Sequence, residues 1–138
     1  MFDPNTRFLV VDDFKTMRTI VKKTLSGLGY TQIDEAEDGK VAHAMVQKAL
    51  SDGKPYGCVV SDWNMPNTTG LEFLKLVRAS DPTKGLPFIL VTAENEQSQV
   101  IEAVKAGVSN YLVKPFTPAD FQKKLEVAWA KHFKAQAA

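Results

Sequence analysis

The chain has 138 residues, of which 44% are hydrophobic and 24% charged, and its formal net charge is +1 at pH 7. This length suits one domain with a real hydrophobic core and is short for two. A charge near zero without a basic block argues against nucleic-acid binding. No apolar run approaches the ~20 residues of a membrane span, residues 1–5 do not resemble a signal peptide, and the single Cys58 cannot form an internal disulfide. We therefore expect one cytoplasmic domain over residues 1–138, with no output domain and with neither nucleic acid nor membrane as a partner.

Short apolar runs alternate along the chain with segments in which apolar residues recur three or four positions apart. The first pattern is typical of buried strands and the second of amphipathic helices. Pro, Asn and Gly residues between 64 and 70 indicate a loop, and Thr117 with Asp120 three residues on resembles a capped helix start. In chain order the pattern predicts a strand at 8–11, a helix at 17–28, a strand at 33–36, a helix at 42–49, a strand at 57–61, a helix at 71–77, a strand at 88–91, a helix at 100–107, a strand at 111–113 and a helix at 117–128.

Five strands alternating with five helices favour a doubly wound α/β fold. The strands are apolar throughout rather than at every second residue, as a parallel sheet covered by helices on both faces requires. We predict a five-stranded parallel sheet in the order 2-1-3-4-5, flanked by five helices in the flavodoxin-like arrangement.

Four of the predicted strands end at polar residues that suit chemistry better than a core. Asp12 and Asp13 follow the first strand, Asp62 the third, Thr92 the fourth and Lys114 the fifth. In open α/β sheets, ligands bind outside the carboxyl ends of the strands, where the winding reverses. The first and third strands are neighbours there, so the three carboxylates should lie together, with Thr92 and Lys114 on the flanking strands.

Three carboxylates in one cleft repel each other, and a hard divalent cation resolves this repulsion. Mg2+ prefers oxygen ligands and uses one or two carboxylates together with phosphoryl oxygens and waters. Asp13 would be the main direct ligand, Asp12 a direct or water-mediated one, and Asp62 would share the ion with the backbone carbonyl of Asn64. Asp62 could then accept a phosphoryl group as an aspartyl phosphate. Lys114 would supply a second positive charge and Thr92 a hydrogen bond.

Several separated motifs resemble the response-regulator receiver family, and among its members the CheY-like chemotaxis regulators. The sheet rule used above draws on such proteins, so it adds no independent support to this resemblance. The matching motifs are FLVVDDF at 8–14, TMR at 16–18, EAEDG at 35–39, SDWNMP at 61–66, VTAE at 91–94 and YLVKPFT at 111–117.

The resemblance implies a role for each site residue. Asp62 would be the phosphoacceptor, and Asp12, Asp13 and the Asn64 carbonyl would bind Mg2+. Lys114 would be the conserved lysine of the family and Thr92 its switch hydroxyl. Further roles fall to Tyr111 as the aromatic switch, to Asn64 and Glu94 in tuning the phosphoryl lifetime, and to a cis bond before Pro115. The expected output surface on the fourth helix, fifth strand and fifth helix comprises Asn95, Gln97, Val100, Tyr111, Val113 and Lys124.

The same resemblance implies the partners: a CheA-like histidine kinase, a FliM-like flagellar motor switch protein and a phosphatase. The protein would be a monomeric switch that assists its own phosphorylation and dephosphorylation rather than a conventional enzyme. The sequence departs from the family pattern in two places. The segment 48–55 is longer, away from the predicted site, and NEQSQ at 95–99 replaces a lysine-bearing stretch of the output surface. The second departure bears on partner choice, because interface charges set specificity.

Simpler interpretations stay open for individual residues. Asp12 with Asp13, or Asp62 beside its loop, could serve only as turn or cap residues. Tyr111 could be an ordinary half-buried core residue, and Trp63 an exposed aromatic. Three other functions are also compatible with the fold class: a flavodoxin-like electron carrier, an aspartate-nucleophile phosphohydrolase, and a receiver that acts as a phosphate sink or on a non-flagellar partner.

Overall fold

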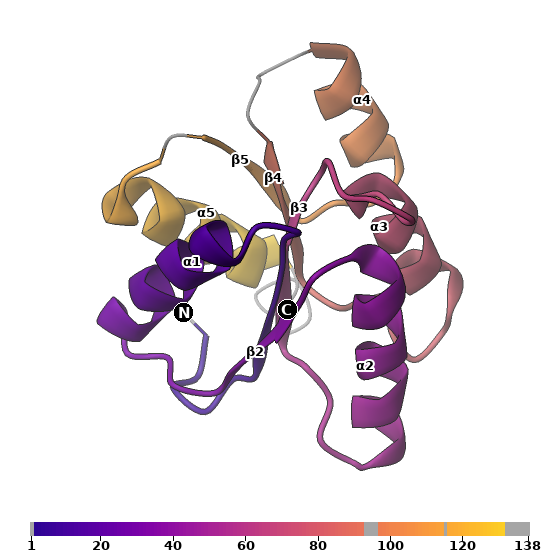
Figure 1. Cartoon of the computed structure of the whole chain (residues 1–138), viewed down its shortest axis with the longest axis horizontal. Coiled ribbons are helices and arrows are strands. Elements are labelled where there is room, and N and C mark those ends of the chain that lie inside the picture. The colour runs from indigo at the N-terminus through magenta and orange to yellow at the C-terminus, as the bar shows by residue number, and fades with distance from the viewer. Residues whose placement is uncertain (1, 93–96, 115, 132–138) are drawn as a thin grey trace.

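The computed structural model describes residues 2–92, 97–114 and 116–131, which form one five-stranded sheet with helices on both faces (Figure 1). Strands and helices alternate from start to end, as the sequence predicts. The strands are β1 Phe8–Val11, β2 Ile33–Ala36, β3 Cys58–Asp62, β4 Phe88–Thr92 and β5 Asn110–Val113. The helices are α1 Lys15–Gly27, α2 Gly39–Ser51, α3 Gly70–Ala79, α4 Gln97–Lys105 and α5 Pro118–Trp129.

The sheet has the predicted strand order, β2-β1-β3-β4-β5, and all its strand pairs are parallel. The register aligns the carboxyl ends of neighbouring strands. Val11 pairs with Ala36 on β2 and with Ser61 on β3, and Asp62 pairs with Val91 on β4. The residues that follow β1 and end β3 therefore emerge side by side at one edge of the sheet, and the fold prediction is confirmed.

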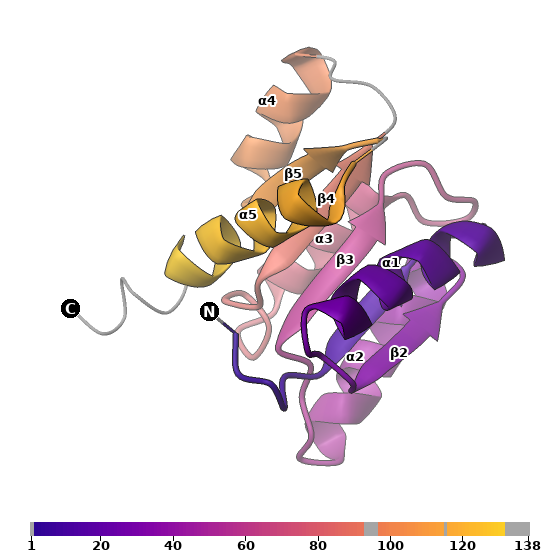
Figure 2. The same ribbon diagram turned by 90° about the vertical axis from the view of Figure 1, so that its left-hand side faces the viewer.

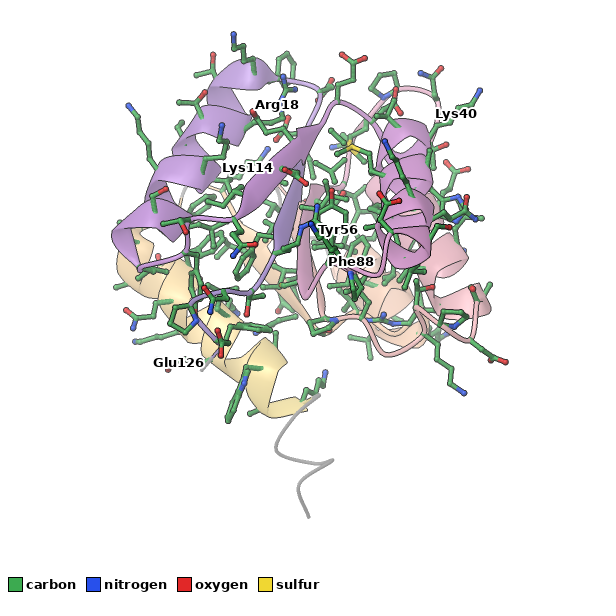
Figure 3. All side chains as sticks on the ribbon, turned by 90° about the horizontal axis from the view of Figure 1, so that it is seen from below. Arg18, Lys40, Tyr56, Phe88, Lys114 and Glu126 are labelled. Atoms are coloured by element: carbon green, nitrogen blue, oxygen red, sulfur yellow. The ribbon has the colours of Figure 1, made fainter. Side chains whose placement is uncertain are left out.

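Two hydrophobic layers explain why the central strands β1, β3 and β4 are almost entirely apolar. Figure 2 shows α1 and α5 on one face of the sheet, with α2 and α3 behind it on the other. On β1, Phe8 and Val10 belong to the layer under α1 and α5, whereas Leu9 and Val11 belong to the opposite layer. Side chains fill the space between sheet and helices, and Phe88 lies in this interior with no exposed surface (Figure 3). The residues of the central strands β1, β3 and β4 are therefore buried on both faces of the sheet.

The helix α4 packs least among the described elements. Its Ala103 is fully buried, but Ile101 and Val104 are 47% and 61% exposed. Ile101 and Val104, two of the apolar residues from which the sequence predicts this helix, therefore do not face the core. No helix among the described residues has the length and apolar character needed to cross a bilayer.

The helices α5 and α3 each begin with a reciprocal side-chain cap. Thr117 accepts a hydrogen bond from the backbone N–H of Asp120, whose carboxylate accepts one from the N–H of Thr117. This reciprocal capping box confirms the predicted start of α5. Thr69 and Glu72 form the same arrangement at the start of α3, which fixes the loop that follows β3.

Candidate functional site

Three carboxylates converge at the carboxyl end of the sheet, as expected from the strand order. Asp12 and Asp13 follow β1, and Asp62 is the last residue of β3. Each offers an oxygen, and these oxygens all lie within 4.8 Å of one another. Asp12 and Asp62 are only 4% and 6% exposed, which is rare for carboxylates without a partner. The predicted acidic cluster is therefore present, and turn or cap chemistry alone does not explain the burial of Asp12 and Asp62.

Asp12 is held on several sides. Its backbone N–H donates to the carbonyl of Ala36 on β2 at 3.1 Å, and its Oδ1 accepts from the backbone N–H of Phe14 at 2.9 Å. The Nζ of Lys114 lies 3.6 Å from its Oδ2. Burial raises the pKa of Asp12, the hydrogen bond from Phe14 opposes this, and the neighbouring Asp62 adds to the increase. The surroundings thus disfavour the charged form of this carboxylate, and a bound cation would stabilise it.

The two carboxylate oxygens of Asp62 have different hydrogen-bond partners. Its Oδ1 accepts from the backbone N–H of Trp63 at 3.0 Å and from Nζ of Lys114 at 3.2 Å. Its Oδ2 accepts no hydrogen bond from the residues that the structure describes. Burial raises the pKa of Asp62, and Lys114 opposes this shift. One oxygen is therefore fixed by the protein, and the other is left for a ligand.

Asp13 supplies the clearest indication of a metal. Its Oδ1 is buried and has no hydrogen-bond partner within the described part of the chain. A buried, unsatisfied carboxylate oxygen is costly, since it has lost its water without gaining a donor. A hard cation would satisfy this oxygen and neutralise the cluster, and three carboxylates are ligands that suit Mg2+. The residues present therefore fit a magnesium ion.

The loop after β3 is packed tightly against the strand end. The N–H of Trp63 donates to Val91 on β4, and the N–H of Gly70 donates back to the carbonyl of Trp63, both at 2.9 Å. A Cβ on Gly70 would collide with the backbone carbonyl of Asp62, so only glycine allows this approach. Trp63 is 8% exposed, so its interpretation as an exposed aromatic is wrong. Asn64 follows as an exposed residue at the rim of the site.

Thr92 and Lys114 complete the site from the flanking strands. Thr92 ends β4 and is 5% exposed, and Lys114 directly follows β5. The backbone N–H of Lys114 donates to the carbonyl of Thr92 at 2.7 Å, which ties the lysine to the end of β4. From there its side chain reaches across to Asp62 and Asp12. All four polar strand ends predicted from the sequence thus meet at one site.

Part of the predicted output surface lies beside this site. Tyr111 on β5 is half-buried, and Nζ of Lys124 lies 5.0 Å from the centroid of its ring. Both line a shallow hollow of about 300 Å³ together with Val113. Glu94, Asn95 and Pro115 lie outside the described residues, and the side chains of Gln97 and Val100 in α4 do too. An apolar hollow of about 290 Å³ at the opposite, amino end of the sheet contains none of the predicted site residues.

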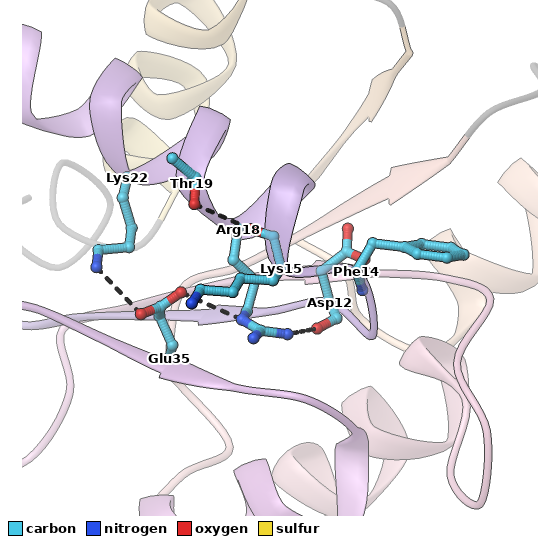
Figure 4. A network of polar contacts seen from close by, with 7 residues as sticks. All are labelled: Asp12, Phe14, Lys15, Arg18, Thr19, Lys22 and Glu35. Carbon is cyan, nitrogen blue, oxygen red and sulfur yellow. Dashed lines mark hydrogen bonds and ion pairs between the residues drawn. The ribbon is translucent and has the colours of Figure 1, made fainter.

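The sequence gives no role to Arg18, although it lies in one of the matching motifs. Arg18 donates from a guanidinium NH group to the backbone carbonyl of Asp12 at 2.6 Å, and its Nε donates to Glu35 at 3.2 Å (Figure 4). Arg18 and Glu35 are 17 positions apart and belong to different elements. Only charge complementarity between the two motifs could have pointed to this contact.

Fold and site together define a protein of the receiver class, in which an acidic strand-end site supports a phosphorylation switch. The model of the response regulator receiver domain family matches residues 8–126, and the chain belongs to this family. It is CheY-like, since it is 45% identical to chemotaxis protein CheY-3 of Vibrio cholerae over 126 residues, covering 91% of this chain and 93% of that one. It is 46% identical to chemotaxis protein CheY of Pseudomonas aeruginosa over 120 residues, covering 87% and 93%.

A structurally similar receiver domain has been solved with magnesium bound. The receiver domain of a sensor histidine kinase from Pseudomonas aeruginosa, solved with a magnesium ion coordinated in its active site cleft, superposes with a TM-score of 0.76. The two chains are 26% identical, and the match covers 88% of this chain and 95% of the other. Receiver domains bind Mg2+ in their active site and act as phosphorylation-switch regulators, not as classical enzymes. They work with histidine kinases and response partners.

Proposed function

We propose that this chain is a chemotaxis-type response regulator whose phosphoacceptor is Asp62. The observation that carries the proposal is the asymmetry of the Asp62 carboxylate. Lys114 and a backbone N–H hold Oδ1, while Oδ2 accepts no hydrogen bond from the described residues. Two further carboxylates lie close by, and a buried oxygen of one of them has no partner in the described part of the chain. This arrangement combines a positioned nucleophile with a site for a cation.

Asp13 would hold the magnesium ion through its buried Oδ1, with Asp12, Asp62 and the backbone carbonyl of Asn64 as further ligands. When bound, Mg2+ neutralises charge on the oxygens of the incoming phosphoryl group. The dependence on Mg2+ follows from charge, because three carboxylates alone would repel a phosphate.

The chemical step belongs to Asp62. Its Oδ2 attacks the phosphorus of a phosphohistidine on the kinase, an O–P bond forms, the P–N bond breaks, and the histidine leaves. Lys114 holds the other oxygen at 3.2 Å and offsets the negative charge of the resulting aspartyl phosphate. Thr92 would hydrogen bond to the phosphoryl group. Hydrolysis returns the carboxylate, so the protein takes part in its own dephosphorylation, with Asn64 and Glu94 tuning the rate.

Phosphorylation would be read on the surface of α4, β5 and α5. A shift of Thr92 towards the phosphoryl group frees space into which Tyr111 turns, and the partner recognises the changed surface. The relatives named as chemotaxis proteins support a CheA-like kinase and a FliM-like motor switch protein as partners of a single-domain, monomeric, cytoplasmic regulator. The exposed Val104 on α4 and the hollow beside Tyr111 offer apolar surface for such a partner.

The test is binding of a flagellar switch-protein peptide in Mg2+, with and without beryllofluoride as a phosphoryl mimic. Fluorescence of Trp63, which is buried next to Asp62, reports whether metal and mimic occupy the site. About tenfold tighter binding with the mimic corresponds to a coupling of about 1.4 kcal/mol and supports the motor role. An occupied site with unchanged peptide affinity keeps the receiver chemistry and indicates a phosphate sink or a non-flagellar partner. The Asp62→Asn variant should lose the response to the mimic.

A further inference from the structure

The peptide between Asp12 and Asp13 joins the two acidic residues that follow β1. Its carbonyl oxygen, that of Asp12, accepts a hydrogen bond at 2.6 Å from a guanidinium NH of Arg18. The N–H of Asp12 is fixed by Ala36, and its Oδ1 by Phe14. Among the described residues, the carbonyl of this peptide is therefore held by Arg18 and not by a neighbouring strand.

The orientation of the Asp13 side chain depends on this peptide plane more than the orientation of the Asp12 side chain does. The carboxylate of Asp12 has donors in Phe14 and Lys114, but the buried Oδ1 of Asp13 has no partner among the described residues. No described residue therefore holds the Asp13 side chain through this oxygen before a cation binds. Its direction follows from the backbone, and the backbone carbonyl next to it is held by Arg18.

Arg18 is itself held in the required position. Its Nε donates to Oε1 of Glu35 at 3.2 Å, while Nζ of Lys22 lies 3.0 Å from Oε2 of the same carboxylate (Figure 4). The side chain of Arg18 is only 15% exposed, against 40% for Lys22. A planar guanidinium can donate to two acceptors at a fixed angle, which a lysine ammonium cannot reproduce. The chain of contacts runs from β2 through Arg18 to the end of β1.

We propose that Arg18 is a positioning residue of the metal site, which presets the Asp12–Asp13 turn for Mg2+ through its hydrogen bond to the Asp12 carbonyl. This inference rests on the proposed function, since it concerns the same magnesium site. Partners of metal ligands that do not touch the metal commonly change affinity by about 10–100-fold when they are removed. Glu35 acts one step further out, by holding the guanidinium.

A role through charge and a role through positioning predict opposite changes in Mg2+ affinity. Arg18 and Lys22 are both cations near a cation site, so an influence through charge alone means that removing either one leaves Mg2+ affinity unchanged or strengthens it. A positioning role means that Arg18→Ala weakens Mg2+ binding although a repelling charge has been removed. Lys22→Ala is the matched control, because it removes the same charge from the same carboxylate without a described contact to Asp12.

The experiment is a Mg2+ titration followed by Trp63 fluorescence, on protein first stripped of metal with EDTA. We expect Arg18→Ala to raise the dissociation constant by about tenfold or more, Lys22→Ala to leave it within twofold or lower it, and Arg18→Lys to fail to restore wild-type affinity. Amide NMR in EDTA provides a signature without metal: the resonance of the Asp13 N–H, which shares the peptide with the Asp12 carbonyl, should shift in Arg18→Ala and not in Lys22→Ala.

Arg18→Ala binding Mg2+ as tightly as wild type, or more tightly, would overturn the inference. If that variant does not fold, Arg18→Lys decides the question at constant charge, and wild-type affinity in that variant counts against the proposal. Wild-type protein that fails to bind Mg2+ would instead contradict the proposed function. The two failures are therefore distinguishable.

Discussion

Lys114 and Asp62 are 52 positions apart in the sequence, and Nζ of the lysine lies 3.2 Å from Oδ1 of the carboxylate. The same ammonium is 3.6 Å from Oδ2 of Asp12, so one side chain next to the end of β5 contacts both the acidic residue after β1 and the one that ends β3. Without metal, Lys114 is the only cation among the described residues that forms an ion pair with the acidic cluster. The apo site and the metal-bound site should thus depend on this lysine in opposite ways.

Replacing Lys114 with Met should destabilise the apo protein and leave Mg2+ binding intact or tighter. The variant leaves two buried carboxylates without their counter-charge, at a cost of about 1–3 kcal/mol. Added Mg2+ should recover more stability than it gives the wild type. Urea unfolding in EDTA and in Mg2+ measures both effects. Lys84→Met is the control, since that lysine is exposed and pairs only loosely with Asp81 at 3.8 Å. Equal loss in the two variants would contradict this account.

Asp62→Asn should abolish phosphorylation and stabilise the apo fold. Burial raises the pKa of Asp62, which means that the folded protein disfavours its charged form. A neutral amide of the same size removes that penalty and the repulsion with Asp13. Thermal unfolding in EDTA at neutral pH checks the stability, and a small phosphodonor in Mg2+ checks the chemistry. A variant that still takes up phosphate would exclude Asp62 as the acceptor.

Gly70→Ala should destabilise the protein by about 1–3 kcal/mol, because the new Cβ would press on the backbone carbonyl of Asp62. The displacement would reach the phosphoacceptor, so Mg2+ affinity should fall as well. Gly27→Ala is the matched control. Nothing lies within 4 Å of a Cβ at Gly27, near the end of α1, so alanine should be neutral there or add up to about 1 kcal/mol. Comparing the free energies of unfolding of Gly70→Ala and Gly27→Ala in denaturant separates the steric effect of the new Cβ from the effect of helix propensity.

Glu35→Gln should change the acid limb of the stability profile. Burial tends to raise the pKa of Glu35, but the hydrogen bonds from Lys22 and Arg18 outweigh it and hold the pKa below 4.5. A lowered folded-state pKa contributes stability that is present above the unfolded value and is lost as pH falls through the folded one. The wild type should therefore lose more stability than Glu35→Gln when the pH is lowered below 4.5. The free energy of unfolding of both proteins is measured by urea unfolding from pH 6 to pH 3. An equal loss of stability in the wild type and in Glu35→Gln would contradict the ion pairs of Glu35.

The sequence by itself determines the sheet and the members of the acidic cluster. Continuous apolar runs mark the central strands because both faces of the sheet are covered, and polar residues at the ends of four strands mark the functional edge. Asp12, Asp13, Asp62, Thr92 and Lys114 follow from their positions alone, since carboxyl ends of parallel strands meet at one edge. These are consequences of local pattern and topology.

Only the tertiary structure decides how that edge is supported. The bond from Arg18 to the Asp12 carbonyl, the approach of Gly70 to Asp62, the burial of Trp63 and the exposure of Val104 depend on how loops and helices pack on the sheet. Periodicity reports which residues share a face of one element, but it carries no information on the distance between two elements. The sequence therefore identifies the side chains that could bind a metal, and packing decides which neighbours hold them in place.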